Sequence, residues 1–167
     1  MPLMLSEQQQ QHFSQLLQRE IELARALTIA LEIEYKALSS PDTTGLVSIV
    51  AEKQDIINAL EAAGKQRETQ LTALGVLEGS NTAHEIQRVF NSTRQLSDDW
   101  DELLQLAAQC QEKNRINGSI VELGVRHSIN ALEILRGNVT GDAATINLYD
   151  HSGHTSNAAE KRSIAQA

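Results

Sequence analysis

One stretch decides the fold of this chain: residues 100–135, which read WDELLQLAAQCQEKNRINGSIVELGVRHSINALEIL. It contains no proline. Steps of four and three residues in alternation, starting at Leu96, pick out one continuous series of positions through it. A period of 3.5 residues is typical of a long helix with a coiled-coil seam. The seam positions are Leu96, Trp100, Leu103, Ala107, Cys110, Asn114, Asn117, Val121, Gly124, Ser128, Ala131 and Leu135. The seam is apolar at both ends and polar in its middle. This indicates that its central residues do more than fill a core.

The composition of the whole chain also favours helices. The 167 residues are 41% hydrophobic but only 3% aromatic, with just two prolines. Gln, Glu, Leu and Ala dominate, and these residues lose little rotamer freedom in a helix. We therefore predict an all-α protein. The net charge of −8 argues against nucleic acid and anionic membranes as partners, because both require a basic face.

The single cysteine, Cys110, excludes an intrachain disulfide and fits a reducing compartment. It falls on the seam, where we expect it to act as a small hydrophobic residue. No secretory leader opens the chain, and no run of about 18 apolar residues occurs, so we expect no membrane insertion. These features predict a cytoplasmic protein.

Start and stop signals divide the chain into four expected helices. The first ends at Ser39-Ser-Pro-Asp42, because the residue before proline is pushed out of the helical region. Thr43 or Thr44 is expected to cap the second helix, and Gly137 suits the C-terminal end of the last. The expected helices cover about residues 6–38, 44–74, 82–91 and 93–136.

Short connections place consecutive helices antiparallel. Residues 1–137 are therefore predicted to form an elongated up-down helical bundle or coiled coil of three long helices and one short helix. The character of the sequence changes after this point, since residues 138–167 are polar and rich in turn formers. Too little apolar surface is available there to offset ordering, so we predict a mobile tail.

A second apolar stripe runs beside the seam in the C-terminal half of the long helix. Its members are Ile116, Ile120, Leu123, His127 and Ile134. The apolar face therefore widens where the seam becomes small and polar. Two interpretations stay open: this half is buried against both other helices, or part of its face is a docking groove for a partner helix.

No sequence pattern for catalysis or for a cofactor is present. Metal sites in helical bundles use Glu-x-x-His pairs, and no glutamate stands three residues before any of the five histidines. His151 and His154, next to Asp150, could bind a transition metal only weakly. Phosphate loops, nucleotide-binding glycine motifs and nucleophile elbows are also absent from the sequence. We expect a non-enzyme with no catalytic residue, no metal and no cofactor.

Two motifs together resemble a known family. Cys110-Gln-x-x-Asn-Arg-x-Asn-Gly-x-Ile120 follows Trp100, and Leu148-Tyr-x-x-x-Gly-x-Thr155 lies further along the chain. This pair is similar to the motifs of the FlgN family of flagellar type III export chaperones. The resemblance covers residues 45–155, and the first helix by its pattern alone.

The resemblance implies a cytoplasmic chaperone for the hook–filament junction proteins FlgK and FlgL. Such a chaperone covers the self-assembling terminal helices of its client, prevents premature assembly and delivers the client to the export gate protein FlhA. The resemblance also implies that the C-terminal part binds the client and that Tyr149 docks to the gate. With the apolar face of the long helix, the expected client-binding residues are Ile116, Ile120, Leu123, His127, Ile134, Leu135, Ile146 and Leu148.

Other interpretations stay open beside this one. A structural coiled-coil protein would use its seam to oligomerise, as a homodimer for example, and would have no secretion client. A small enzyme or metal-binding bundle is the third class. Asn114, Asn117 and Gly118 either set the register of the helices or form a polar patch kept for a partner. Tyr149 could instead pack back on the bundle.

Overall fold

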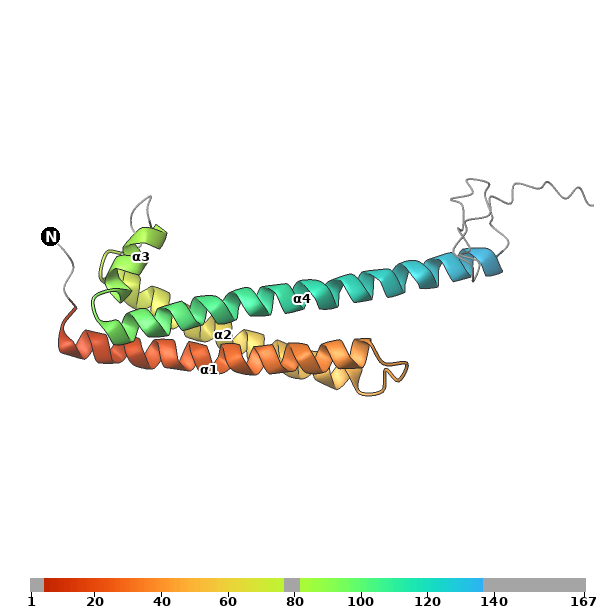
Figure 1. Cartoon of the computed structure of the whole chain (residues 1–167), viewed down its shortest axis with the longest axis horizontal. Helices are drawn as coiled ribbons and strands as arrows, with labels where there is room; N and C mark the ends of the chain where they lie inside the picture. The colour runs from red at the N-terminus through yellow and green to blue at the C-terminus, as the bar shows by residue number, and fades with distance from the viewer. Residues whose placement is uncertain (1–4, 77–81, 137–167) are drawn as a thin grey trace, which may run out of the picture. The chain divides into compact units, whose positions relative to one another are not determined.

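The computed structural model describes residues 5–76 and 82–136, and the regular structure within them is entirely helical (Figure 1). The all-α prediction is thereby confirmed. The expected bounds differ from the observed ones by two residues or fewer. The predicted tail, 138–167, lies outside the described residues. The helices are α1 (Glu7–Leu38), α2 (Leu46–Ala73), α3 (Thr82–Phe90) and α4 (Arg94–Leu135).

The start of each long helix has its own local cause. At α1, the Ser6 hydroxyl accepts from the Gln9 amide while the Gln9 side chain accepts from the Ser6 amide, which is a complete capping box. At α4, the Thr93 hydroxyl accepts from the Leu96 amide at 3.3 Å. Residues 91–93 therefore separate α3 from α4 instead of joining them.

The prediction that Thr43 or Thr44 caps α2 is wrong. The N-cap is Gly45, at φ 90°, and no side chain caps this end of the helix. The reason lies in Asp42, whose Oδ1 accepts from the Thr44 amide at 2.8 Å and so turns the chain early. The left-handed backbone that follows requires glycine, because it places the Cβ of other residues too close to a carbonyl oxygen.

The chain divides into two compact units, Met1–Gly124 and Val125–Ala167, and each is described by itself. In the first unit the backbones of α1 and α2 approach each other most closely. The two helices are antiparallel, since Glu20 pairs with Arg67 and Glu34 pairs with Lys53. Two ion pairs of low exposure thus fix the register of this helical hairpin.

The first part of α4 runs parallel to α1. Gln18 donates to Asp99, and further along both helices the Thr28 hydroxyl lies 3.2 Å from the sulfur of Cys110. Between these contacts, Arg25 binds Glu102. The residue numbers rise together on both helices, as they do for the first and third helices of an up-down arrangement.

The main core lies at the end of the first unit where α1 begins. Phe13 meets Phe90 edge to face with ring centroids 5.5 Å apart, and Phe90 lies 4.9 Å from Trp100. Because Phe90 belongs to α3 and is fully buried, the short helix packs onto the long ones. A second, smaller cluster around Leu31 and Cys110 lies further along. The core is thus large at one end of the unit and thin at the other.

Candidate partner-binding surface of α4

From Leu96 to Asn117 the seam of α4 is buried at every second position only. Its buried members are Leu96, Leu103, Cys110 and Asn117, seven residues apart. The positions between them are less covered, since Trp100 is half-buried while Ala107 and Asn114 are exposed. A spacing of seven means that α4 presents a narrow line of contacts to α1, not the two-position seam of a full coiled coil.

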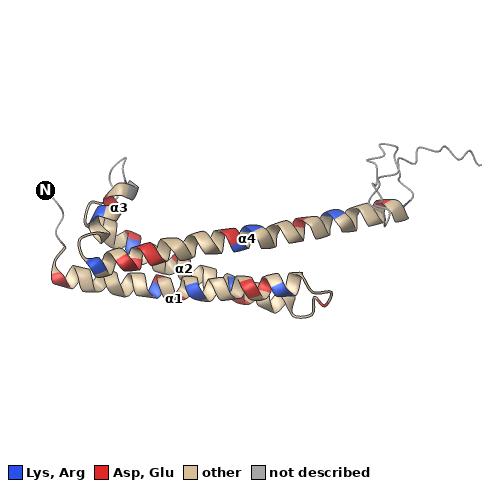
Figure 2. Cartoon of the chain, in the orientation of Figure 1, with Lys and Arg blue, Asp and Glu red and all other residues tan. Residues whose placement is uncertain are grey.

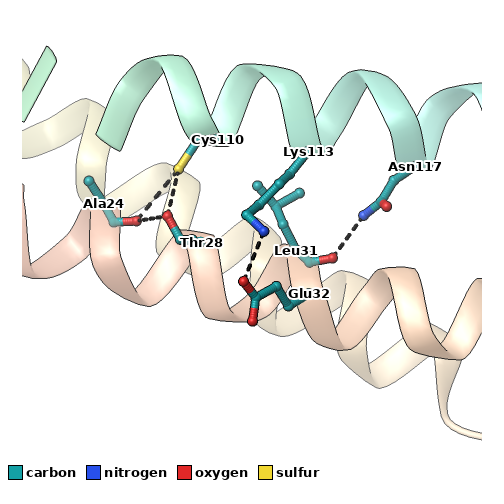
Figure 3. Close-up of polar contacts among 7 residues, drawn as sticks. All are labelled: Ala24, Thr28, Leu31, Glu32, Cys110, Lys113 and Asn117. Carbon is teal, nitrogen blue, oxygen red and sulfur yellow. Dashed lines mark hydrogen bonds and ion pairs between the residues drawn. The ribbon is translucent and has the colours of Figure 1, made fainter. Parts of the chain in front are cut away.

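Asn117 fastens α4 to α1 where the buried line ends (Figure 3). Its side chain is 3% exposed, and its Nδ2 donates to the Leu31 carbonyl oxygen at 3.0 Å and to Glu34 Oε2 at 2.7 Å. The other oxygen of Glu34 accepts from Lys53 on α2 at 2.6 Å. The buried carboxylate of Glu34 on α1 therefore links α4 and α2 to α1. Asn114, one helical turn before Asn117, is exposed.

Two further polar contacts hold the same stretch of α4 (Figure 3). The Cys110 thiol is buried in the smaller apolar cluster, as expected of a small hydrophobic residue, and it also lies 3.5 Å from the Ala24 carbonyl oxygen. Lys113 Nζ donates to Glu32 Oε1 at 2.8 Å. This hydrogen bond and the positive charge of Lys113 lower the pKa of the exposed Glu32 carboxyl.

No described residue of α4 after Asn117 is buried. The interpretation that the C-terminal half is buried against both other helices is therefore wrong for residues 118–124, which belong to the first unit. In the first unit the cause is the length of α1. Leu31 and Glu34 already lie opposite Asn117, and α1 ends at Leu38, so roughly one helical turn of α1 remains.

The expected client-binding residues on α4 are mostly exposed. Ile120 is half-buried, and Gly118 is exposed beside the buried Asn117. The expected residues Ile146, Leu148 and Tyr149 lie outside the described residues. The exposed members of the expected set are Ile116, Leu123, His127, Ile134 and Leu135.

Four exposed apolar residues of α4 were not expected in this role. They are Val121, Val125, Ile129 and Leu132. Val121 belongs to the seam, and the other three follow it at steps of four, four and three residues, which places them on one helical face. This periodicity was available in the sequence. Residues 116–135 contain only three charged side chains, and Figure 2 shows how sparse charge becomes toward this end of α4.

Within 5–76 and 82–136, no group of three or more His, Cys, Asp or Glu side chains could hold a metal ion. In the same residues no helix combines the length and the hydropathy needed to cross a bilayer. What α4 of the first unit does offer is a short run of exposed apolar residues, Ile116, Val121 and Leu123.

A family model described as FlgN protein matches residues 1–157. The chain belongs to the FlgN family of flagellar export chaperones. The match includes α1, although both motifs that carried the resemblance lie after α1 in the chain. It also extends past Thr155, the last residue of the second motif. No match was found among curated proteins or among solved structures.

Membership of the FlgN family bears on the role of the exposed apolar residues of α4. The family is one of chaperones and not of enzymes, and it implies binding of flagellar hook-associated proteins. A chaperone of this kind needs an apolar surface that stays uncovered until a client arrives. Most of the large apolar residues in the C-terminal half of α4 are exposed.

Proposed function

We propose that this chain is a cytoplasmic export chaperone whose clients are the hook–filament junction proteins of the FlgK and FlgL type. It binds the self-assembling terminal helices of the client, prevents premature assembly and delivers the client to the flagellar export gate. The observation that carries the proposal is the exposed apolar surface of α4 beyond Asn117, in a chain of the FlgN family.

The chemistry of this surface suits an amphipathic helix. Leu123 is 56% exposed, and exposed apolar residues on either side of it extend the surface over several helical turns. Fully burying one such side chain stabilises a complex by about 1.5–3 kcal/mol, so covering several offsets the cost of association. The surplus is modest, as a chaperone that must release its client requires.

The tail completes the proposal. Ile146 and Leu148 add apolar contacts to the client, and Tyr149 docks to the gate protein of the FlhA type. Ordering a tail on a partner costs a few kcal/mol, which again keeps the complex releasable. The three long helices serve as one up-down bundle that carries these elements.

A coiled-coil scaffold protein is the second candidate, because the same exposed surface could pair with a second copy. In that case the chain would be a homodimer without a secretion client. The contact between copies would cover Val121 and Leu123, both exposed in the first unit.

Isothermal titration tests the first proposal with the full chain and the FlgK- or FlgL-type protein of the same genome. Leu123→Glu should weaken binding at least tenfold, because it places a charge in the apolar contact. Leu104→Glu is the matched control, since Leu104 lies on the same helix and is 47% exposed, but in the part of α4 before Asn117 that packs on α1. Removing 138–167 should abolish binding.

Equal binding by the Leu123→Glu and Leu104→Glu variants would refute the client surface. Sedimentation velocity separates the two candidates. A mass that stays monomeric at every concentration excludes the scaffold. A dimer that Leu123→Glu dissociates, in a chain that binds neither client, would establish the scaffold instead.

A further inference from the structure

A cleft lies between α1 and α4 near the buried Asn117, within the first unit. Its volume is about 320 Å³, at the small end of the range for ligand pockets, which is roughly 300–1,000 Å³. Apolar side chains from both helices line it, namely Leu31, Tyr35 and Ile116. Charged side chains from both helices also line it, namely Glu32, Lys36 and Lys113. A cleft of this size suits one large side chain of a partner and not a whole helix.

The apolar lining is left partly open to solvent. Tyr35 on α1 is 48% exposed and Ile116 on α4 is 37% exposed, whereas Leu31 is buried. A tyrosine ring offers a large apolar area at a low cost in conformational entropy, and tyrosine is enriched among the residues that dominate binding energy. An apolar group seated in the cleft would remove both exposed side chains from water, which favours binding.

The charged lining is positive on balance. Lys113 Nζ on α4 donates to Glu32 Oε1 on α1 at 2.8 Å, so these two charges offset each other (Figure 3). Lys36 is exposed one helical turn after Glu32 and adds a second positive charge. The chain as a whole carries a net charge of −8, so the balance at this cleft is opposite in sign to that of the chain. The rim therefore attracts a partner that brings a carboxylate.

An apolar cleft with a positive rim matches an apolar side chain that has a carboxylate beside it. Residues three or four apart share one face of a helix, so an amphipathic helix can supply both groups from neighbouring turns. We propose that this cleft is an anchor pocket for a large apolar side chain of the client's terminal helix, with an aspartate or glutamate one turn away paired to Lys36. The inference rests on the proposed function and adds α1 to a surface otherwise formed by α4.

The position of the cleft agrees with a client helix that lies along α4. Ile116 lines the cleft and is also the first residue of the stripe that continues through Ile120 and Leu123. These three residues belong to the first unit and extend over two helical turns, or roughly 10 Å. A helix packed along the stripe therefore meets the cleft at one end of the contact.

Isothermal titration of the full chain with the FlgK- or FlgL-type protein of the same genome tests the apolar anchor. Tyr35→Ala should weaken binding about tenfold, because it removes one wall of the pocket. Ile33→Ala is the matched control, since Ile33 lies on the same helix and is 47% exposed, but does not line the cleft. It should leave binding unchanged. Thermal melting verifies that both variants are folded.

A charge swap tests the carboxylate. Each aspartate and glutamate in the terminal helices of the client is replaced in turn by lysine and titrated against the unaltered chain and its Lys36→Glu variant. Lys36→Glu should weaken binding of the unaltered client several-fold, and one client substitution should restore it. Lys65→Glu makes the same change of charge at an exposed position on α2, outside the cleft, and should leave binding unchanged. Restoration by the swap also shows that the Lys36→Glu variant is folded.

The outcomes separate the pocket from the proposed function. Equal binding by the Tyr35→Ala and Ile33→Ala variants overturns the apolar anchor, and a series in which no client substitution restores binding overturns its acidic neighbour. Either result leaves a chaperone that binds its client elsewhere. A dimer of the unaltered chain that Tyr35→Ala dissociates would assign the cleft to a second copy and overturn the proposal. Absence of client binding by the unaltered, folded chain overturns the proposed function and the pocket together.

Discussion

The buried ion pair between Glu20 and Arg67 offers a sharp test of how the first unit is held together. Its hydrogen bonds measure 2.7 and 3.2 Å, and the two side chains are 5% and 13% exposed. The guanidinium also lies 5.1 Å from the ring of Trp100. We predict that Arg67→Met strongly destabilises the fold, whereas Arg67→Met combined with Glu20→Leu does not.

The magnitude follows from which charge is left behind. Methionine keeps the packing on Trp100, so the main effect of Arg67→Met is a buried carboxylate without its cation. Breaking a buried pair in this way costs about 3–5 kcal/mol, and we expect about 3 because Arg67 is partly exposed. Replacing both charges by apolar groups is often neutral, so the double variant should lie within about 1 kcal/mol of the unaltered chain.

Urea unfolding followed by the fluorescence of Trp100, the only tryptophan in the chain, measures this loss of stability. With a slope of about 2 kcal/mol per molar urea, Arg67→Met should lower the midpoint by about 1.5 M. The double variant should restore most of that loss. If the double variant is as unstable as Arg67→Met alone, the loss comes from packing, and the electrostatic argument is refuted.

Two further predictions concern backbone and charge. Gly45→Ala should lower the free energy of unfolding by about 1 kcal/mol, because φ is 90° there. Gly118→Ala should raise it by up to about 1 kcal/mol, because Gly118 lies inside α4 and an added Cβ meets open space. Thermal melts in which both variants shift in the same direction would contradict this. Lys113→Ala should raise the pKa of Glu32 toward its ordinary value, as measured by NMR titration of the side-chain carboxyl. Because the folded pKa of Glu32 is lowered, any stability from this pair is present at neutral pH and is lost as the pH falls through that pKa, so an unchanged titration curve in the variant would disprove the assignment.

The sequence was sufficient for the helices because the pattern that defines them is local. Periodicity and the proline that follows α1 are read from neighbouring residues, and the resulting bounds are close to those observed. The cap of α2 was missed because a competing side chain, Asp42, takes the Thr44 amide. Composition alone does not rank two candidate hydrogen bonds.

The two central asparagines show where periodicity stops being informative. Asn114 and Asn117 occupy equivalent places in a 3.5-residue pattern, yet one is exposed and the other is buried. Which of them faces α1 depends on how far apart the helices lie, and that distance is set by side chains from three helices. The polar partners of Asn117, Leu31 and Glu34, stand more than 80 residues away in the chain.

The position of Asn117 explains why the seam is polar at its centre. Up to this residue α4 is held by the core and by polar contacts to α1, and beyond it every side chain of α4 except the half-buried Ile120 is exposed. An apolar residue at 117 would continue the buried line but would also let α4 slide along α1, since apolar contacts have no direction. The two hydrogen bonds of Asn117 are directional, so they fix where the held part of the helix ends. The proposed client-binding surface begins one residue earlier, at Ile116, so its first residues are held at a defined position along α1.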